Sequence, residues 1–487
     1  MSSIIRKLEP SALWQHFDEL NAVPRASKKE EEVIQFMLDF AKDLNLPAQK
    51  DAVGNLLIRK AASTGMEGRK TVVLQSHLDM VHQKNNDTDF DFSRQGIQMY
   101  IQDDWVKAKG TTLGADNGIG VAAIMAILSS TDIAHPAIEA LLTIDEETGM
   151  TGAKGLQAGM LTGDILLNLD TEEDTEIDIG CAGGIDITAK LDYQPEALEG
   201  SVSRYAITVK GLHGGHSGIE IHKGLGNANK ILNRVLFHLS ALGVRLIRIE
   251  GGGLRNAIPR ESAAVIATQE VTFAQLNAHL EEILPDIKAE YANVDEGLEI
   301  TLEKLPDESN VQVVPAVVHD KLIKSIYAAH NGVYRMSSDF ADLVETSNNI
   351  ARIQVSQGEI LVKCLTRSSV ESSKYDLANA LKSCFELMGA QVRFSGDYPG
   401  WTPNANSAIL DVLVGTYSEL FGTSPEVVAC HAGLECGILG TNYPQMDMIS
   451  FGPTIRGAHS PQERVSISSV QKFWTYLKEI LIRIPTK

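Results

Sequence analysis

Three short apolar runs in the first part of the chain end in residues that can do chemistry. The runs TVVLQS, ALLTI and DILLNL lead into His77 and Asp79, into residues 145–147 and into Asp170, respectively. Such brief runs, rich in Val, Ile and Leu, are typical of strands buried on both faces of a mostly parallel sheet. In open α/β sheets, ligands bind beyond the carboxyl ends of the strands. The pattern therefore predicts an α/β fold whose sheet gathers these polar side chains at one edge.

Helical patterns alternate with these runs. Residues 27–45 place apolar side chains at helical spacing after Ser27, which is suited to cap a helix. The segment NGIGVAAIMAILSS reads as an apolar helix, and SVQKFWTYLKEILIRI reads as an amphipathic helix that closes the chain. Strands that alternate with helices in this way indicate an α/β architecture.

The pattern changes near residue 185. Between Tyr205 and about Phe394 the order reads strand, helix, strand, strand, helix, and then a similar series again, of which LEITLEKL is the first strand. We interpret these series as two split β-α-β units in a separate α+β insert. The predicted domains are residues 1–186 with 396–487, which carry the chemistry, and residues 187–395, which form the insert.

The composition excludes some classes of partner. A formal net charge of −20 and a pI near 5.1 leave no net basic field to attract nucleic acid or an anionic membrane. The chain lacks the ~18-residue apolar stretch of a membrane span, and its first residues lack the apolar core of a signal peptide. The five cysteines are scattered and odd in number, unlike a disulfide framework. We expect a cytoplasmic protein with neither a nucleic-acid nor a membrane partner.

The segment SHLDMVH follows the first apolar run. In an extended segment His77 and Asp79 project to the same side. A histidine and a carboxylate placed in this way suit a divalent metal ion and the group that orients its ligand. A strand end with a hydrogen-bonded histidine explains the same pair.

The segment TTLGADNGIG places Asp116 and Asn117 between glycines at the start of the apolar helix. Either residue can cap the helix, which is a common role for Asp and Asn. The same position also holds a carboxylate rigidly at the sheet edge, as a ligand shared by two metal ions requires. Both readings fit the sequence.

The segment DEETG is the most informative. Three adjacent acids at the end of a buried strand are electrostatically costly unless cations lie among them. Neighbouring strand residues point to opposite faces, so Glu146 and Glu147 take different roles, one as a metal ligand and the other beside the attacking water. A solvated acidic loop is the alternative. The acid-rich run TEEDTEID after Asp170 is expected to be mostly solvated.

The segment GPTIRGAHSP adds His459 in a glycine-rich loop far along the chain. Two histidines with three or more carboxylates can hold two divalent ions with open positions, a layout suited to water activation and carbonyl polarisation. The segment CHAGLEC also groups Cys430, His431 and Cys436, but it lacks a fourth ligand and the compact spacing of structural zinc sites.

Five ordered motifs, SHLDMV, GTTLGADNGIG, TIDEETGMTGA, LNLDTEE and GAHSP, resemble those of the dinuclear-zinc exopeptidases that include glutamate carboxypeptidase, tripeptidase T and the aminoacylases. Within this family, GLHGGHSG and HAGLECG are most similar to the aminoacyl-histidine dipeptidases. The resemblance spans essentially the whole chain. It implies a zinc-exopeptidase-type, mostly parallel sheet with helices on both faces, and an inserted α+β lid that also forms a homodimer.

The resemblance further implies two divalent metal ions, in the first place zinc, with manganese or cobalt as alternatives. Asp116 is expected to bridge the two ions. His77 and Asp170 then complete one site, and Glu147 and His459 complete the other.

The remaining roles also follow from the resemblance. Glu146 is expected to act as general base and then as general acid, and Asp79 to orient His77. His216 in GGHSG is expected to come from the other subunit of a dimer and to steady the oxyanion. Glu435 lies where relatives carry a GGTD-like loop, which leaves its role near the substrate amine open. The candidate substrate contacts are His216, Asn256, Arg367 and Glu435.

We therefore expect a metal-dependent dipeptidase that hydrolyses short unblocked dipeptides, in particular carnosine-like Xaa-His dipeptides, with water activated by Glu146. An N-acyl-amino-acid deacylase with the same dinuclear site is one alternative. A metal-binding protein without hydrolase activity is another, although such a protein has no need of a base beside Glu147.

Overall fold

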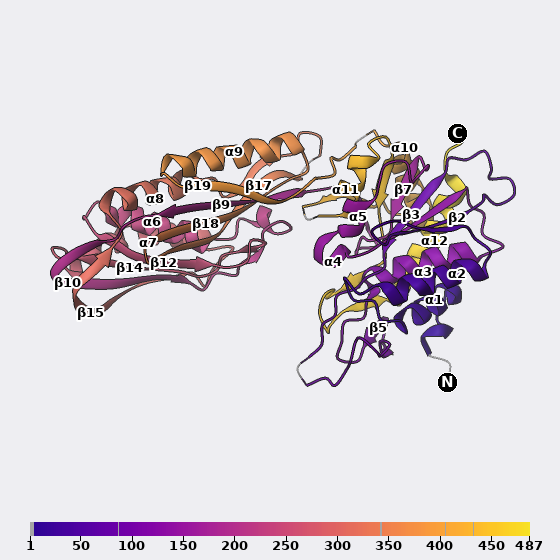
Figure 1. Ribbon diagram of the computed structural model, residues 1–487, viewed down its shortest axis with the longest axis horizontal. Coiled ribbons are helices and arrows are strands. Elements are labelled where there is room, and N and C mark those ends of the chain that lie inside the picture. Colours follow the sequence, from indigo (N-terminus) through magenta and orange to yellow (C-terminus); the bar gives the residue numbers. More distant parts are fainter. Residues whose placement is uncertain (1–3, 86, 341–342, 405, 432) are drawn as a thin grey trace. The chain divides into compact units, whose positions relative to one another are not determined.

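The computed structural model describes residues 4–85, 87–340, 343–404, 406–431 and 433–487. The chain divides into two compact units (Figure 1). Unit 1 comprises Met1–Gly180, Pro403–Ala429 and Leu434–Lys487, and unit 2 comprises Cys181–Thr402 and Cys430–Gly433. Most of unit 2 is therefore one long insertion in the sequence of unit 1.

Unit 1 is built on a mixed sheet with the strand order β1-β2-β6-β3-β7-β21-β8-β20. Its centre is parallel, because β3 (Val72–His77) lies between β6 (Ile138–Thr143) and β7 (Ile165–Asn168) and runs in the same direction as both. Every residue of these strands is buried, which confirms the parallel sheet predicted from the apolar runs. The other strands of this sheet are β1 (Ala48–Lys50), β2 (Leu56–Lys60), β8 (Glu176–Cys181), β20 (Glu426–Cys430) and β21 (Asp447–Ser450).

A smaller sheet of unit 1 has the order β22-β23-β5-β4. Its strands are β4 (Met99–Gln102), β5 (Trp105–Ala108), β22 (Ile455–Arg456) and β23 (Arg464–Ser466). The helices of unit 1 are η1 (Ile4–Lys7), α1 (Ser11–Asn21), α2 (Glu31–Asp43), α3 (Ala115–Ser129), α4 (Glu146–Gly149), α5 (Thr151–Gly155), α10 (Ala408–Phe421), α11 (Glu435–Asn442) and α12 (Ile467–Arg483).

The helices expected in unit 1 are present, with one correction. Helix α3 is apolar nearly all round and packs on β3, while α1 packs on α3 (Figure 1). Helix α2 begins at Glu31, and the prediction that Ser27 caps it is wrong. Lys28 has a φ of 64°, which interrupts helical geometry between Ser27 and the helix. The hydroxyl of Ser27 donates instead to Asp79 Oδ2 at 2.7 Å.

Unit 2 is an antiparallel sheet covered by helices, with the strand order β15-β10-β14-β12-β17-β18-β9-β19 and with β16 paired to β17. Helix α6 contacts α7 and α8, and α8 contacts α9, so the helices form a continuous row (Figure 1). Apolar side chains from this row and from the strands make up one core. The helices of unit 2 are η2 (Ile221–Lys223), α6 (Ala228–Ser240), α7 (Phe273–Tyr291), α8 (Ala316–Ala328) and α9 (Glu371–Leu387).

The strands of unit 2 form the two split β-α-β units expected from the sequence, but one strand belongs to a different unit. LEITLEKL lies in β15, which pairs with β10 and closes the first unit instead of opening the second. The second unit opens with β9, which precedes the whole first unit in the chain. The strands are β9 (Gly183–Asp192), β10 (Glu196–Lys210), β11 (Gly215–His216), β12 (Arg245–Gly252), β13 (Ala257–Ile258), β14 (Ser262–Thr268), β15 (Glu299–Val313), β16 (Gly332–Met336), β17 (Val344–Ser356), β18 (Glu359–Ser368) and β19 (Gln391–Tyr398).

The length and hydropathy of the helices show whether any of them could cross a membrane. Across the described ranges, no helix combines the length and the apolar character that a bilayer span requires.

Candidate metal centre

Neighbouring parallel strands deliver the candidate ligands of unit 1. Strand β3 ends at His77, β6 is followed by α4, and β7 ends two residues before Asp170. Because these strands are adjacent and parallel, their carboxyl ends meet at the same edge of the sheet. Asp116 lies at the start of α3, and His459 lies in the loop between β22 and β23.

Asp116 stands between two clusters of candidate ligands. Its Oδ1 lies 3.1 Å from His77 Nε2, which is also 3.5 Å from Asp170 Oδ1. Its Oδ2 lies 3.1 Å from His459 Nε2, which is also 2.9 Å from Glu147 Oε2. Each cluster offers three ligand atoms that lie within 4.8 Å of one another. One carboxylate therefore presents a different oxygen to each cluster.

The structure bears on the alternative that Asp116 or Asn117 caps the helix. The N-cap position of α3 is Gly114, and the helix has no side-chain cap hydrogen bond. Asn117 does not cap the helix either, because its Oδ1 accepts no hydrogen bond from the described residues, while its Nδ2 donates to the carbonyl of Leu169 at 2.6 Å. Asp116 has a non-helical backbone, with φ of −81° and ψ of 111°, and its carboxylate lies against the two histidines.

The donor set fits divalent cations. Glu147 Oε1 and Asp170 Oδ1 are buried and have no hydrogen-bond partner among the residues that the structure describes. A buried carboxylate oxygen without a partner is costly, and a bound cation removes that cost. Imidazole nitrogens and carboxylate oxygens are ligands that zinc, manganese and cobalt accept.

Burial is the largest influence on the pKa values of the carboxylates in this cluster. Burial raises the pKa of Glu147 and of Asp170, and it raises that of Glu146 well above the ordinary value. Burial opposes the ionised form of Asp116 as well, but hydrogen bonds with His459 and His77 hold its pKa low. Hydrogen bonds with Asp116 and then with Glu147 raise the pKa of His459 to about 11.

Asp79 connects His77 to the acidic turn. The Nδ1 atom of His77 lies 3.1 Å from the carbonyl oxygen of Asp79 and 3.4 Å from its Oδ1. The carboxylate of Asp79 also accepts the backbone N–H of Glu146 at 3.0 Å and that of Glu147 at 3.3 Å. With Nδ1 engaged in this way, His77 presents Nε2 to Asp116 and Asp170.

The three adjacent acids have three separate environments. Asp145 is buried, has a φ of 52°, and accepts hydrogen bonds from the hydroxyls of Thr148 and Thr151, so it supports the turn. Glu147 faces His459. Glu146 groups with His77 and Glu147, with ligand atoms within 4.8 Å of one another. The alternative of a solvated acidic loop is therefore wrong.

Two buried residues that no sequence motif singled out hold the ligand loops in place. The carboxylate of Glu463 accepts the backbone N–H groups of residues 113–116 at 2.7 to 3.3 Å, and burial raises its pKa to about 6. The guanidinium of Arg25 donates to the carbonyls of Leu78, Asp79 and Gly114, and burial lowers its pKa to about 10. No local pattern marks either residue, because their partners are distant in the sequence.

The expectation that TEEDTEID is mostly solvated is wrong. Glu173 pairs with Arg456, and Asp174 lies 3.3 Å from Lys472. Glu172 is half-buried, and burial together with the charges of Asp116 and Asp170 raises its pKa to about 8. Glu172 is therefore close enough to the candidate centre for Asp116 and Asp170 to disfavour its ionised form.

Glu435 is a buried acid on the same sheet. It begins α11, and its Oε2 accepts hydrogen bonds from Gln75 Nε2 at 2.7 Å and from Thr143 Oγ1 at 2.6 Å. Its Oε1 is buried and, within the described part of the chain, has no hydrogen-bond partner. Burial raises the pKa of Glu435 to about 7. The structure places it beside the strand ends that carry the candidate ligands.

In unit 2, the geometry of His216 sets its tautomer. Its Nδ1 accepts the backbone N–H groups of Gly218 and Ile219 at 3.2 and 3.0 Å. The proton of the neutral ring is therefore on Nε2, which leaves that nitrogen as a donor. Burial lowers the pKa of His216, so the neutral form is favoured.

Arg367 and Asn256 lie on the same side of unit 2 as His216. Arg367 is buried on β18 and donates from Nη1 to the hydroxyl of Tyr398 at 2.9 Å. Its Nε has no hydrogen-bond partner in the ranges that the structure describes. Asn256 has an exposed side chain, and its carbonyl accepts the N–H of Ser217, beside His216. Unit 2 thus brings all three residues into one neighbourhood.

His431 does not form part of a cysteine site. Its Nε2 lies 2.8 Å from Ser347 Oγ, and burial lowers its pKa to about 3. No metal-like group of His431 with Cys430 and Cys436 occurs among the described residues.

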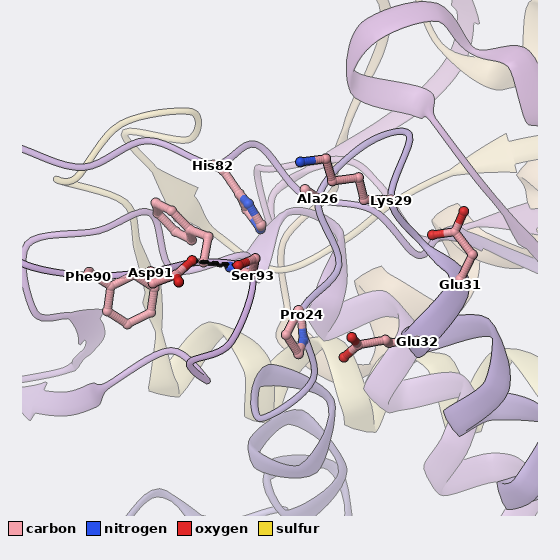
Figure 2. Close-up of a pocket in the computed structure, with 10 residues that line it drawn as sticks. Pro24, Ala26, Lys29, Glu31, Glu32, His82, Phe90, Asp91 and Ser93 are labelled. Atoms are coloured by element: carbon pink, nitrogen blue, oxygen red, sulfur yellow. Dashed lines mark hydrogen bonds between the residues drawn. The ribbon is translucent and has the colours of Figure 1, made fainter.

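Unit 1 also has a surface pocket of about 640 Å³ (Figure 2). His82, Phe90 and Asp91 line one side of it, and Lys29 and Glu32 line the other. Its lining includes none of the candidate metal ligands. The pocket and the candidate centre are therefore lined by different residues.

Two clusters of imidazole and carboxylate ligands that share one aspartate, at the carboxyl edge of a parallel sheet, have the layout of a dinuclear metallohydrolase centre. The chain belongs to peptidase family M20/M25/M40, whose family model matches residues 73–483.

Comparisons with individual proteins agree with this family. The chain is 45% identical over 486 residues to the cytosol non-specific dipeptidase of Escherichia coli, and the match covers 100% of both chains. The crystal structure of aminoacylhistidine dipeptidase from Vibrio alginolyticus superposes with a TM-score of 0.94 at 44% identity, covering 100% of this chain and 99% of that one. A tripeptidase structure from Staphylococcus aureus, at 16% identity and a TM-score of 0.61, covers 97% and 98% of the two chains and shares the fold.

Proposed function

We propose that this chain is a cytosolic metal-dependent dipeptidase that hydrolyses short unblocked dipeptides. Family membership and the full-length similarity to two dipeptidases support the reaction. The observation that carries the proposal is the position of Asp116 between the His77–Asp170 and Glu147–His459 pairs, with Glu146 beside them.

We further propose that the centre holds two divalent ions, zinc in the first place. Asp116 would bridge them, with His77 and Asp170 on one ion and Glu147 and His459 on the other. When bound, such ions supply Lewis-acid polarisation of the peptide carbonyl and make water more acidic. The partnerless oxygens of Glu147 and Asp170 support this assignment.

Glu146 would move the proton. Burial raises its pKa, and a carboxylate with a raised pKa can accept a proton from the attacking water and return it to the leaving amine near neutral pH. Asp79 would hold Glu146 in position, because its Oδ1 accepts the backbone N–H of Glu146. Asp79 also orients His77, so one carboxylate would position both a ligand and the base.

Four further residues are proposed to contact the substrate. The partnerless Oε1 of Glu435 is suited to the free α-amine. The guanidinium of Arg367 is suited to the terminal carboxylate, because a planar fork binds carboxylates in a bidentate manner. The Nε2–H of His216 is suited to the developing oxyanion. Asn256, with its exposed amide, is proposed as an additional contact.

Three finer points belong to the same proposal. We infer a preference for Xaa-His dipeptides from the similarity to the aminoacylhistidine dipeptidase of V. alginolyticus. Unit 2 would act as a lid and would form a homodimer, in which His216 serves the other subunit. The sheet and helix row of unit 2 form a core separate from unit 1, which is consistent with a lid.

The test is a substrate panel assayed with each metal. The chelated protein receives zinc, manganese or cobalt in turn and is offered dipeptides, carnosine and N-acetyl amino acids. We expect hydrolysis of unblocked dipeptides, with no turnover before metal is added. Selective hydrolysis of N-acetyl amino acids would instead show a deacylase, and metal uptake without turnover would show a binding protein.

A further inference from the structure

A second group of metal-type ligands lies on the helices of unit 2. His238 is in the last turn of α6, and His279 and Glu282 lie one turn apart on α7. His238 Nε2 and His279 Nδ1 each lie 3.4 Å from Glu282 Oε2, and these three ligand atoms lie within 4.8 Å of one another. Because α6 and α7 pack together, the group spans two helices.

The nitrogen–oxygen distances in this group are long for charge-assisted hydrogen bonds, although His279 and Glu282 still form one, and they match the spacing of metal ligands. A charge-assisted N–H···O bond is about 2.7–2.9 Å long. Ligands at about 2.0–2.1 Å from a tetrahedral zinc ion lie about 3.4 Å apart, which is the separation seen here. His238 Nε2 is also shielded from solvent and, in the portion of the chain that the structure covers, has no hydrogen-bond partner.

We propose that His238, His279 and Glu282 bind one divalent transition-metal ion, zinc in the first place, which cross-links α6 to α7. Two imidazoles and one carboxylate form a donor set that zinc accepts, with a fourth position left for water. The side chains are 34%, 38% and 60% exposed, so an ion can reach the group from solvent.

The ion would stabilise one end of the helix pair. The same two helices are joined farther along by Arg234 and Glu290, whose guanidinium and carboxylate atoms lie 2.6 and 3.0 Å apart. Helix α7 contains Pro285, which removes one helical hydrogen bond between the two cross-links. A metal ion at Glu282 would therefore hold the half of α7 that precedes this break. This role is independent of the centre in unit 1.

The experiment compares zinc bound by the full-length protein and by two matched variants. Glu282→Gln removes a ligand, whereas Glu290→Gln breaks the Arg234 ion pair on the same helices and leaves the ligands in place. Each protein is stripped with a chelator, dialysed against buffered micromolar free zinc, and analysed for zinc per chain. We expect Glu282→Gln to bind one zinc fewer than the wild type, and Glu290→Gln to bind the same number. Because the measured quantity is a difference, it does not depend on how many ions unit 1 binds.

Hydrogen exchange supplies a second readout. Zinc should slow amide exchange in the first half of α7 in the wild type and in Glu290→Gln, and should leave it unchanged in Glu282→Gln and in His238→Asn. Dipeptide hydrolysis should be the same in all four proteins, which separates this site from the proposed active site. Equal zinc content in the wild type and Glu282→Gln, or equal zinc-dependent protection in the two, would overturn the proposal.

Discussion

The two candidate cation sites differ in how their ligands are held. In unit 1 the ligands follow buried strands, and Asp79, Glu463 and Arg25 fix them through hydrogen bonds to side chains and backbone. In unit 2 the ligands are partly exposed side chains on two helices. A site whose ligands are already oriented loses less entropy on binding than one whose ligands must be ordered. We therefore expect tight binding in unit 1 and exchangeable binding in unit 2.

The units also differ in the kind of titratable group that they bury, although burial favours the uncharged form in both. Unit 1 buries carboxylates such as Glu435, whose pKa rises to about 7, so without cations the cluster favours bound protons. Unit 2 buries imidazoles such as His319, whose pKa falls to about 4. A buried neutral imidazole is tolerated without a counter-ion, whereas several buried carboxylates are not. The buried carboxylates of unit 1 are therefore better suited to hold cations than the buried imidazole of His319.

The largest expected effect comes from the base. Glu146→Gln should lower turnover by about 10²- to 10⁴-fold, because the side chain can no longer accept a proton. Its metal content should stay at the wild-type value, since Glu146 is not one of the proposed ligands. Metal analysis and dipeptide assays of the same preparation check this. The control Glu147→Gln should lose bound metal, and wild-type turnover in Glu146→Gln would contradict the proposed base.

The second prediction concerns the acid sensitivity of unit 2. Burial first, and then the charge of Arg245, lower the pKa of His319 from 6.5 to about 4. The unfolded chain binds more protons between these values, so this contribution to stability is present above pH 6.5 and is lost as the pH falls towards 4. The loss should be at most about 3 kcal/mol.

His319→Gln should weaken the dependence of the stability of unit 2 on pH. Urea unfolding from pH 7 to pH 4 measures this dependence for the whole protein, and hydrogen exchange in α8 measures it in unit 2 alone. His330→Gln serves as a control on the same unit, because His330 is less buried. An unchanged pH slope in His319→Gln would show that another group controls acid unfolding of unit 2.

The third prediction tests whether the proposed metal ligands of unit 1 are already oriented before metal binds. Glu463→Gln replaces one of the two acceptor oxygens that receive the N–H groups of residues 113–116 with a donor. Metal affinity should fall by about 10- to 100-fold, as is typical when a group that supports a ligand is altered. Competition with a chelator of known affinity measures the change.

A matched surface variant accompanies this test. Glu419→Gln breaks the exposed pair with Arg483 at 2.6 Å, and it should leave metal affinity unchanged because exposed pairs contribute little. If Glu463→Gln bound metal as tightly as the wild type, the expectation that the ligands of unit 1 are oriented before metal binds, unlike those of unit 2, would be wrong.

The smallest expected effect is on substrate binding. Arg367→Lys should lower kcat/KM for dipeptides about tenfold, mainly by raising KM, because a single ammonium cannot form the bidentate pair. Steady-state kinetics with a dipeptide and with its C-terminal amide provide the measurement. The amide should be hydrolysed equally by both proteins. Arg352→Lys, on neighbouring β17, should behave as wild type, and a lower kcat with unchanged KM in Arg367→Lys would argue against carboxylate binding.

Local sequence patterns predicted part of the candidate centre of unit 1. Strands such as β3 are buried on both faces and so are continuously apolar, and their length and ends are visible in local patterns. Because adjacent parallel strands end at one edge, these local patterns are sufficient to group His77 with Asp170. The family resemblance then extends this group to His459, which no local pattern connects to the others.

Only the tertiary structure decided which distant segments meet. Strand β9 and not LEITLEKL opens the second unit of the insert, because hydrogen-bond pairing between strands depends on long-range contacts that local patterns do not record. Glu463 holds the Asp116 loop, and His238 meets Glu282, only because separate elements pack side by side. The type and local spacing of a residue thus indicate which chemistry it is capable of. Its burial and its partners depend on tertiary packing, and they determine which contacts it makes.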